Sequence, residues 1–264
     1  MSSSTPPLTL SSITTTLRAA GCVFAEDEAD LLLAAGTDPA RLAAMVERRV
    51  AGLPLEHVLG WAEFHGLRIA VDPGVFVPRR RTEFLVSQAA ALAPAGAVVV
   101  DMCCGSGALG AALASMLPGV ELHAADVEPA AVRCARRNVG GLGTVYEGDL
   151  FAPLPASLRG RVDVLLANVP YVPTGDVGFL PAEARVHEPR VALDGGGDGL
   201  DVMRRVAAEA PHWLTPGGSL FVETSERQAA RARETVGAGG LDARVVVSEE
   251  LYANVVIGTR SERP

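Results

Sequence analysis

The sequence predicts an α/β protein built on a doubly wound, mostly parallel sheet. From Ala97 onward, short apolar segments alternate with helical segments, the pattern typical of right-handed strand–helix–strand crossovers. The segment AVVVDM, ending at Met102, is continuously apolar until its aspartate, as expected for a strand buried on both faces. The last two strand segments, 242–250 and 252–260, are joined too closely for a crossover helix, so we expect them to pair antiparallel.

Composition limits the classes of protein that the chain can belong to. Its 264 residues allow one core domain with a smaller attachment, and 48% of them are apolar. The formal net charge of −8 argues against a protein that binds nucleic acid. The first residues lack the features of a signal peptide, and no apolar run is long enough to span a membrane. We therefore expect a cytoplasmic protein with no membrane partner.

The N-terminal quarter differs from the rest. Residues 1–10 are rich in Ser, Thr and Pro and are expected to be a disordered tail. Residues 11–60 are predicted to form a small helical subdomain, in which Asp38 caps a helix that starts at Pro39. Residues 61–78 are predicted to form a β-hairpin linker that turns at His65-Gly66. Residues 79–264 then form the larger domain.

The larger domain is predicted to alternate helices and strands in order. Helices are expected at 81–94, 106–117, 129–139, 198–214 and 226–240. Strands are expected at 97–102, 120–127, 144–150, 161–172, 217–225, 242–250 and 252–260.

The loop after the first of these strands contains a glycine pattern. In VVVDMCCGSGALG, Gly105, Gly107 and Gly110 have the spacing of a dinucleotide-binding loop, and Asp126 follows at the expected distance. The cysteines beside it form no C-x-x-C pair, and all four in the chain are expected to be free thiols. The glycine pattern alone leaves the ligand open.

Carboxylates at the strand ends favour a ligand without phosphate. Ligands of doubly wound sheets bind beyond the carboxyl ends of the strands. Asp101, Asp126 and Asp149 all lie at such ends. Asp101 would oppose a diphosphate but favour the cationic end of S-adenosylmethionine, whose ribose hydroxyls and adenine amino group suit the other two acids. We therefore expect S-adenosylmethionine as the cofactor, with an NAD-dependent oxidoreductase as the disfavoured alternative.

A fourth strand end carries the sequence Asn168-Val169-Pro170-Tyr171. The Asn168 side-chain carbonyl and the Val169 backbone carbonyl can accept both hydrogens of a planar –NH₂ group. Pro170 fixes the turn and Tyr171 offers an aromatic face. Two acceptors on one side would aim the nitrogen lone pair at a methyl donor, so positioning would supply most of the catalysis without a dedicated base.

These motifs together resemble the HemK/PrmC class of protein-glutamine methyltransferases, which use S-adenosylmethionine. The resemblance runs from about Leu53 to Arg260. It is carried by PLEHVLGWAEFHGLRIAVDPGVFVPRRRTEFLV, VDMCCGSGALG, NVPYVPTG, EPRVALDGGGDGLD and LTPGGSLFVE. It implies a Rossmann-like methyltransferase sheet, a helical substrate-recognition subdomain and a glutamine-bearing protein substrate such as a peptide chain release factor.

The resemblance also implies roles for individual residues. The loop would line the methionine part of the cofactor, through Cys103, Cys104, Gly105, Ser106 and Gly107. Asp126, with Val127 beside it, would take the ribose, and Asp149 with Leu150 the adenine. Asn168 and Val169 would hold the substrate amide, and Phe76 would lie near the transferred methyl group. No residue pattern indicates a metal site.

Three departures from the family mark a divergent member. Val169 stands where the family has proline, so the turn loses one rigid ring. Cys103 replaces the first loop glycine, which we expect only if the backbone there has no positive φ. Arg80 and Arg81 replace a proline and an acid beside the expected active-site mouth.

The sequence is also compatible with two alternative functions. The enzyme could instead methylate an exocyclic amine of a nucleic-acid base, or it could bind the cofactor without turnover. Glu188-Pro189-Arg190 is interpreted as a structured loop rather than a catalytic group. Glu223 faces either the site or solvent, and Arg79 to Arg81 form either a solvated face or a substrate contact. The five histidines show no metal spacing.

Overall fold

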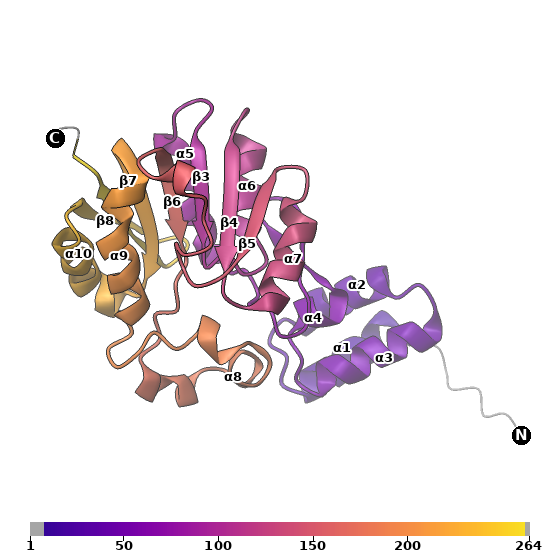
Figure 1. Ribbon diagram of the computed structural model, residues 1–264. Helices are drawn as coiled ribbons and strands as arrows, with labels where there is room; N and C mark the ends of the chain where they lie inside the picture. The colour runs from indigo at the N-terminus through magenta and orange to yellow at the C-terminus, as the bar shows by residue number, and fades with distance from the viewer. Residues whose placement is uncertain (1–7, 262–264) are drawn as a thin grey trace, which may run out of the picture.

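The computed structural model describes residues 8–261, and its centre is a seven-stranded sheet with the order β5-β4-β3-β6-β7-β9-β8 (Figure 1). The strands are β3 (Val98–Met102), β4 (Glu121–Asp126), β5 (Gly143–Glu147), β6 (Val162–Ala167), β7 (Leu214–Thr224), β8 (Asp242–Ser248) and β9 (Ala253–Thr259). Strands β3 to β7 pair in parallel, whereas β9 pairs antiparallel with both β7 and β8. The predicted doubly wound sheet with an antiparallel last strand is confirmed.

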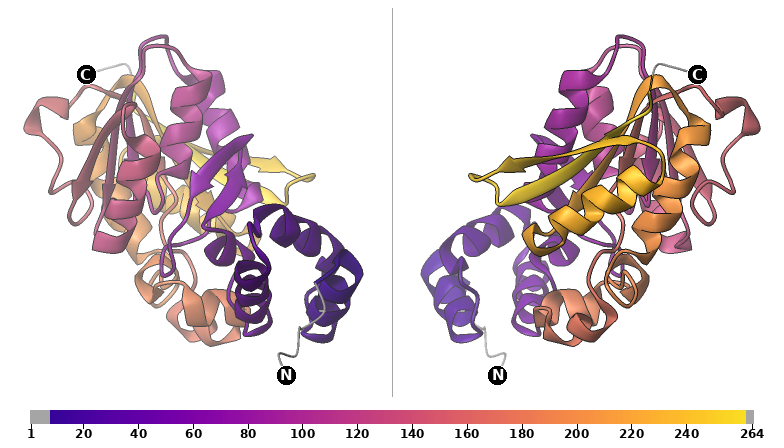
Figure 2. Two further views of the ribbon diagram at one scale, coloured as in Figure 1. Left: turned by 90° about the vertical axis from the view of Figure 1, so that its right-hand side faces the viewer. Right: turned by 90° about the vertical axis from the view of Figure 1, so that its left-hand side faces the viewer.

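Helices cover both faces of this sheet (Figure 2). One face carries α5 (Glu83–Leu92), α6 (Ala108–Met116) and α7 (Pro129–Val139), and the other carries α9 (Asp201–Trp213) and α10 (Ala229–Ala238). Successive residues of a strand point to opposite faces. In β3, Val98 and Val100 accordingly join the core under α9, whereas Val99 joins the core under α5 and α6. Asp101 shares the parity of Val99 and points toward α6.

The N-terminal helices have a small core of their own. They are α1 (Leu10–Ala19), α2 (Ala25–Ala35), α3 (Pro39–Val50) and α4 (Leu55–Leu59). The Asp38 side chain accepts from the Arg41 N–H at 2.9 Å, the expected cap of α3. Of the expected tail, residues 1–7 lie outside the described part of the chain. Thr9 caps α1, so that helix begins inside the stretch expected to be a tail.

A two-stranded hairpin, β1 (Trp61–Phe64) and β2 (Leu67–Ala70), follows these helices. Its turn places His65 and Gly66 at positive φ, as a tight hairpin connection requires. The Asn138 side chain of α7 bonds both the N–H and the carbonyl of Ala70 at 2.9 Å. The Asn138 amide therefore helps to fix the hairpin to the larger domain, together with the His65 N–H, which donates to Glu83 Oε1 at 2.9 Å.

Several short elements had no clear pattern in the sequence. They are α4, α8 (Ala182–His187) and 3-10 helices at Arg80–Thr82, Ala156–Leu158, Thr174–Phe179, Arg190–Ala192 and Glu226–Gln228. The α8 segment lies beside the N-terminal helices at the end of the sheet where the parallel strands finish (Figures 1 and 2). Over residues 8–261, no helix combines the length and the apolar character needed to cross a membrane.

Candidate active site

A cavity of about 480 Å³ lies at the carboxyl ends of β3, β4 and β6, where the strand order changes direction. This is the position at which doubly wound sheets bind ligands. Its wall is lined by most of the residues selected from the sequence, namely Phe76, Cys103, Cys104, Gly105, Ser106, Asp126, Val127, Asp149, Leu150, Asn168, Val169, Pro170 and Tyr171. The expected strand ends therefore converge on one cavity, and two selected residues, Asp101 and Gly107, lie outside its wall.

The two glycines of the loop have different tasks. Gly105 has φ +55°, and a Cβ built there would meet no protein atom within 4 Å, so its open side faces space that a ligand can enter. Gly107 has φ +77°, and its Cβ would come within 2.8 Å of Val139 on α7. Gly107 therefore permits close packing of α6 on α7, whereas Gly105 permits close approach from the cavity.

Cys103 corrects one expectation. Its φ is +54°, in the left-handed region, although it is not glycine. Such a conformation costs about 1–2 kcal/mol for a residue with a Cβ, so Cys103 adopts this loop geometry at an energetic cost. Burial raises the pKa of the thiols of both Cys103 and Cys104, so neither is a thiolate at neutral pH. All four cysteines are free in the described residues.

Asp101 corrects a second expectation. Its side chain is only 1% exposed and points under α6, where Oδ2 accepts from the Gly110 N–H at 2.8 Å. Burial raises the pKa of Asp101 to about 8, and its second oxygen, Oδ1, has no hydrogen-bond partner within residues 8–261. Asp101 is therefore neutral at pH 7 and buttresses the start of α6. It does not present a charge to the cavity.

Asp126 is the acid that faces the cavity beside the glycine loop. Its Oδ2 accepts from the Gly105 N–H at 2.8 Å and its Oδ1 from the Glu128 N–H at 2.9 Å. Burial raises its pKa from the ordinary value, and the backbone N–H groups oppose that shift. Each carboxylate oxygen has a further lone pair, so the group can still accept from a ligand diol.

The third acid, Asp149, is more exposed and is paired. Its Oδ2 lies 2.5 Å from Nη2 of Arg205 on α9, and both side chains line the cavity. The following residue, Leu150, is buried with φ +48°. The sequence missed the Arg205 partner because helix position 205 faces the cavity only after α9 has packed on β6 and β7.

The turn after β6 presents two unused acceptors. Val169 is 1% exposed, Pro170 is buried and Asn168 is half-buried on the cavity wall. Within residues 8–261, neither the Asn168 side chain nor the Val169 carbonyl takes part in a hydrogen bond. Polar groups at a buried site usually have partners. Two free acceptors beside one another are therefore available to a donor that enters the cavity.

Tyr171 is held by a charged pair. Its hydroxyl donates to Glu223 Oε1 at 3.0 Å and accepts from Arg81 Nη2 at 2.7 Å, and Arg81 Nε also bonds that Glu223 oxygen at 3.0 Å. Burial raises the pKa of Tyr171 to about 12, so the phenol stays protonated and keeps donating. Both residues left undecided by the sequence, Arg81 and Glu223, thus orient the aromatic wall of the cavity.

Arg79 and Glu188 join two segments of the rim. The Arg79 Nη2 lies 2.5 Å from Glu188 Oε1, and its guanidinium lies 4.9 Å from the Phe76 ring centre. Glu188 is buried and also accepts from the Val77 N–H at 3.2 Å. This arrangement agrees with the interpretation of Glu188-Pro189-Arg190 as a structured loop, and it fixes Phe76 at the cavity wall.

Residues 180–184, which lead into α8, were not selected from the sequence, yet Leu180, Pro181, Glu183 and Ala184 line the cavity. Arg49 of α3 joins this segment to the N-terminal helices, since its Nη1 lies 2.7 Å from Glu183 and its Nε lies 2.5 Å from the buried Glu28. The hydrogen bonds to Glu28 and Glu183 raise the pKa of Arg49 above its ordinary value and outweigh the opposing effect of burial, so this guanidinium stays charged. A contact across so many residues has no signal in a single sequence.

Comparisons with known proteins show the family to which the chain belongs. The family model described as the methyltransferase small domain matches residues 66–204. The release factor glutamine methyltransferase of Mycolicibacterium smegmatis is 40% identical over 240 residues, covering 84% of this chain and 85% of that protein. The chain belongs to the release factor glutamine methyltransferase family. The member from Geobacter sulfurreducens is 43% identical and covers 73% of this chain and 69% of its own length.

Two further comparisons concern a relative that is named for a different substrate and a solved structure with the same fold. A methyltransferase of Streptomyces pristinaespiralis that is named for 4-amino-L-phenylalanine and 4-methylamino-L-phenylalanine is 36% identical, covering 81% of this chain and 75% of that protein. A methyltransferase structure from Pyrococcus furiosus has a TM-score of 0.57 at 17% identity, covering 83% and 98% of the two chains, and shows the shared fold.

The family member described here is an S-adenosylmethionine-dependent methyltransferase, and its cavity fits that cofactor. Gly105 leaves open space at the loop, and Asp126 keeps lone pairs free for a diol. The volume of about 480 Å³ lies in the usual range for small-molecule sites. In the described part of the chain, no group of three or more His, Cys, Asp or Glu side chains is arranged to hold a metal.

Proposed function

We propose that this enzyme transfers a methyl group from S-adenosylmethionine to the side-chain amide nitrogen of a glutamine in a protein, and that a peptide chain release factor is the substrate. The observation that carries the proposal is the pair of unused acceptors, the Asn168 side chain and the Val169 carbonyl, on the cavity wall. The names of the relatives support the choice of a glutamine.

In this proposal each cavity residue has one task. The loop residues Cys103 to Ser106 contact the methionine part of the cofactor, Asp126 with Val127 takes the ribose, and Asp149 with Leu150 takes the adenine. The bound cofactor supplies an electrophilic methyl group. Because Asp101 is buried beneath the loop, it takes no part in direct contact.

The protein's own contribution to the transfer is orientation. An amide nitrogen is a weak nucleophile, because its lone pair is conjugated with the carbonyl. If Asn168 and Val169 accept its two hydrogens, the nitrogen is held in one plane with its face toward the loop. Tyr171, kept in place by Arg81 and Glu223, packs beside the planar amide and excludes water.

The first test uses Asn168→Ala. We expect the variant to bind S-adenosylmethionine like the wild type in calorimetry, and to lose methyl transfer by roughly a hundredfold or more. A variant that methylates normally would show that Asn168 does not hold the reacting amine.

The second test identifies the substrate. Purified enzyme and labelled S-adenosylmethionine are incubated with the release factors of the source organism, and tryptic peptides are searched for a glutamine heavier by one methylene. Label in free 4-aminophenylalanine but not in protein would instead assign a small amino-acid amine, as in the relative of that name. Methylation of nucleic acid is not favoured, given the net charge of −8 and the named relatives.

The enzyme is further proposed to act in the cytoplasm, where a release factor would meet it. Fractionation of cells with an antibody against the chain tests this, and recovery outside the cytoplasmic fraction would contradict it.

A further inference from the structure

A glycine-rich segment, residues 194–200, lies directly behind the turn that carries Asn168. The two segments form a short parallel bridge between Val172 and Asp194. The Gly195 N–H donates to the Val172 carbonyl at 2.8 Å, and the Thr174 N–H donates to the Gly196 carbonyl at 2.8 Å. The chain that leaves the turn is therefore bonded along its length to residues 194–200.

This contact is closer than side chains would allow. A Cβ on Gly195 would lie 2.6 Å from the Pro170 carbonyl oxygen. A Cβ on Gly199, where φ is +80°, would lie 2.4 Å from the Tyr171 carbonyl oxygen. Both distances are shorter than real Cβ contacts, so the two glycines are required for the segment to reach the backbone of the turn.

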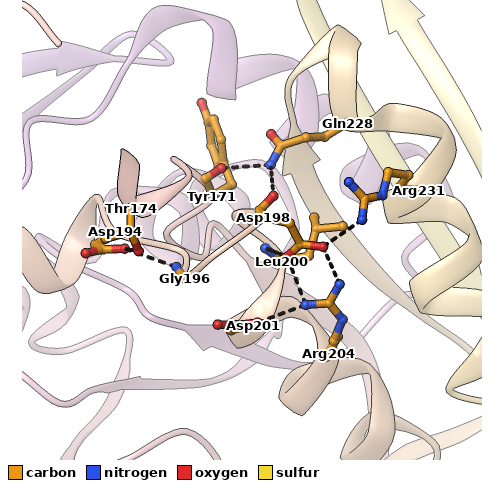
Figure 3. Close-up of polar contacts among 10 residues, drawn as sticks. All are labelled: Tyr171, Thr174, Asp194, Gly196, Asp198, Leu200, Asp201, Arg204, Gln228 and Arg231. Atoms are coloured by element: carbon orange, nitrogen blue, oxygen red, sulfur yellow. Dashed lines mark hydrogen bonds and ion pairs between the residues drawn. The ribbon is translucent and has the colours of Figure 1, made fainter. Parts of the chain in front are cut away.

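The side chain of Gln228 links the turn to the glycine-rich segment (Figure 3). It lies in the short helix Glu226–Gln228 that follows β7. Its Nε2 donates to the Tyr171 carbonyl at 2.9 Å and to the Asp198 carbonyl at 3.0 Å, and its Oε1 accepts from the Ser225 hydroxyl at 2.6 Å. Two carbonyls on one end and a hydroxyl on the other fix the orientation of the amide. Both polar atoms of this side chain, Nε2 and Oε1, therefore form hydrogen bonds.

Asp198 ties the glycine-rich segment to two helices of the domain. Its carboxylate accepts from Arg204 of α9 at 2.5 Å and 2.9 Å, from Arg231 of α10 at 2.9 Å and from the Leu200 N–H at 3.2 Å (Figure 3). The Arg204 guanidinium lowers the pKa of Asp198 to about 2, so it stays ionised at neutral pH. Gln228 therefore connects the turn to the glycine-rich segment, which Asp198 in turn fixes to α9 and α10.

Four of the five residues from Asn168 to Val172 supply acceptors that fall into two groups. The acceptors nearest the cavity, on Asn168 and Val169, make no hydrogen bond within residues 8–261. The next ones, on Tyr171 and Val172, are held by Gln228 and Gly195. Val169 lacks the ring that proline would bring, so the direction of its carbonyl depends on what fixes the chain just after it.

We propose that Gln228 is a positioning residue for methyl transfer: it fixes the Tyr171 end of the turn so that the two free acceptors converge on the amine of the substrate. This inference rests on the proposed function of Asn168 and Val169. Gln228 does not line the cavity and acts only through the turn. Misplacing an oriented nucleophile by about 1 Å can cost a hundredfold in rate.

The test compares Gln228→Ala and Gln228→Glu with Arg227→Ala, an exposed neighbour in the same short helix. The glutamate keeps the size of glutamine but places an acceptor against two carbonyls. We expect kcat to fall roughly 10- to 100-fold in both Gln228 variants, with unchanged KM for the protein substrate and unchanged affinity for S-adenosylmethionine. Arg227→Ala should retain wild-type kcat. Unaltered kcat in Gln228→Glu, or a rise in KM alone, would overturn the inference.

A second readout does not depend on activity. Hydrogen exchange at the amides of Gly195 and Thr174 should accelerate in Gln228→Ala and stay at the wild-type rate in Arg227→Ala, because both amides belong to the bridge that Gln228 holds. Unchanged exchange would show that Gln228 does not fix the turn. If the wild-type enzyme methylates no protein, the proposed function fails, while the exchange experiment still decides whether Gln228 supports the turn.

Discussion

The buried carboxyl of Asp101 should make the stability of the fold depend on pH. In the unfolded chain this acid ionises near its ordinary pKa of 3.8, whereas in the fold its pKa is about 8. Between these values the folded state binds one more proton than the unfolded state. The free energy of unfolding therefore falls as pH rises, by up to about 1.4 kcal/mol per pH unit, and stops falling above the folded pKa.

Asp101→Asn removes this proton while keeping an oxygen that can accept from the Gly110 N–H. The free energy of unfolding of the variant minus that of the wild type should grow by roughly 3 kcal/mol between pH 5 and pH 7. Urea denaturation of both proteins without cofactor, at pH 5, 6, 7 and 8, measures this difference. A constant difference across the range would refute the assignment of a neutral Asp101, and Asp242→Asn on the exposed edge of the sheet controls for the substitution itself.

Four further substitutions test individual features. Asp126→Ala should weaken binding of S-adenosylmethionine about tenfold or more in calorimetry, since hydrogen bonds to a charged group are lost. Cys103→Gly should unfold with a free energy about 0.5–1 kcal/mol above that of Cys103→Ala in urea, because only glycine relieves the positive φ. Arg81→Met should destabilise by roughly 1–3 kcal/mol in urea by leaving Glu223 buried without its cation, and Glu223→Gln in the same chain should restore part of that loss. Glu183→Gln should raise KM for the protein substrate by up to about fivefold with unchanged cofactor affinity, because the ion pair that joins α8 to α3 is half-exposed.

The order of helices and strands could be predicted from the sequence because each signal was local. The continuous apolar run at β3, the Asp38 cap of α3 and the His65-Gly66 turn each depend on neighbouring residues only. The elements that were missed, such as α8, are short and carry no hydrophobic period. They are held by long-range partners, as when Arg49 pairs with Glu183, and a single sequence does not record which residues meet.

Most residues of the candidate site could also be predicted from the sequence. Strand ends such as Asp126 and Asn168 converge because topology alone brings them together. The direction of a side chain within a strand was harder to foresee. Asp101 was taken to face the ligand, but its parity in β3 turns it toward α6, where it is buried. The cofactor inferred from the sequence was right, while the electrostatic reason that relied on Asp101 was wrong.

If the turn after β6 holds the substrate amine, as proposed, the same turn can serve different amines. Asn168 and the Val169 carbonyl can select a planar –NH₂ group, and neither contact distinguishes a glutamine amide from an aryl amine. Discrimination would then come from what surrounds the carrier of that amine, and in this chain the cavity wall there includes Arg81 and residues of the segment 180–184. A relative named for an aryl amino acid at 36% identity fits this division of tasks. Exchange of residues 173–190 between the two enzymes should accordingly alter substrate choice while Asn168 stays essential in both settings.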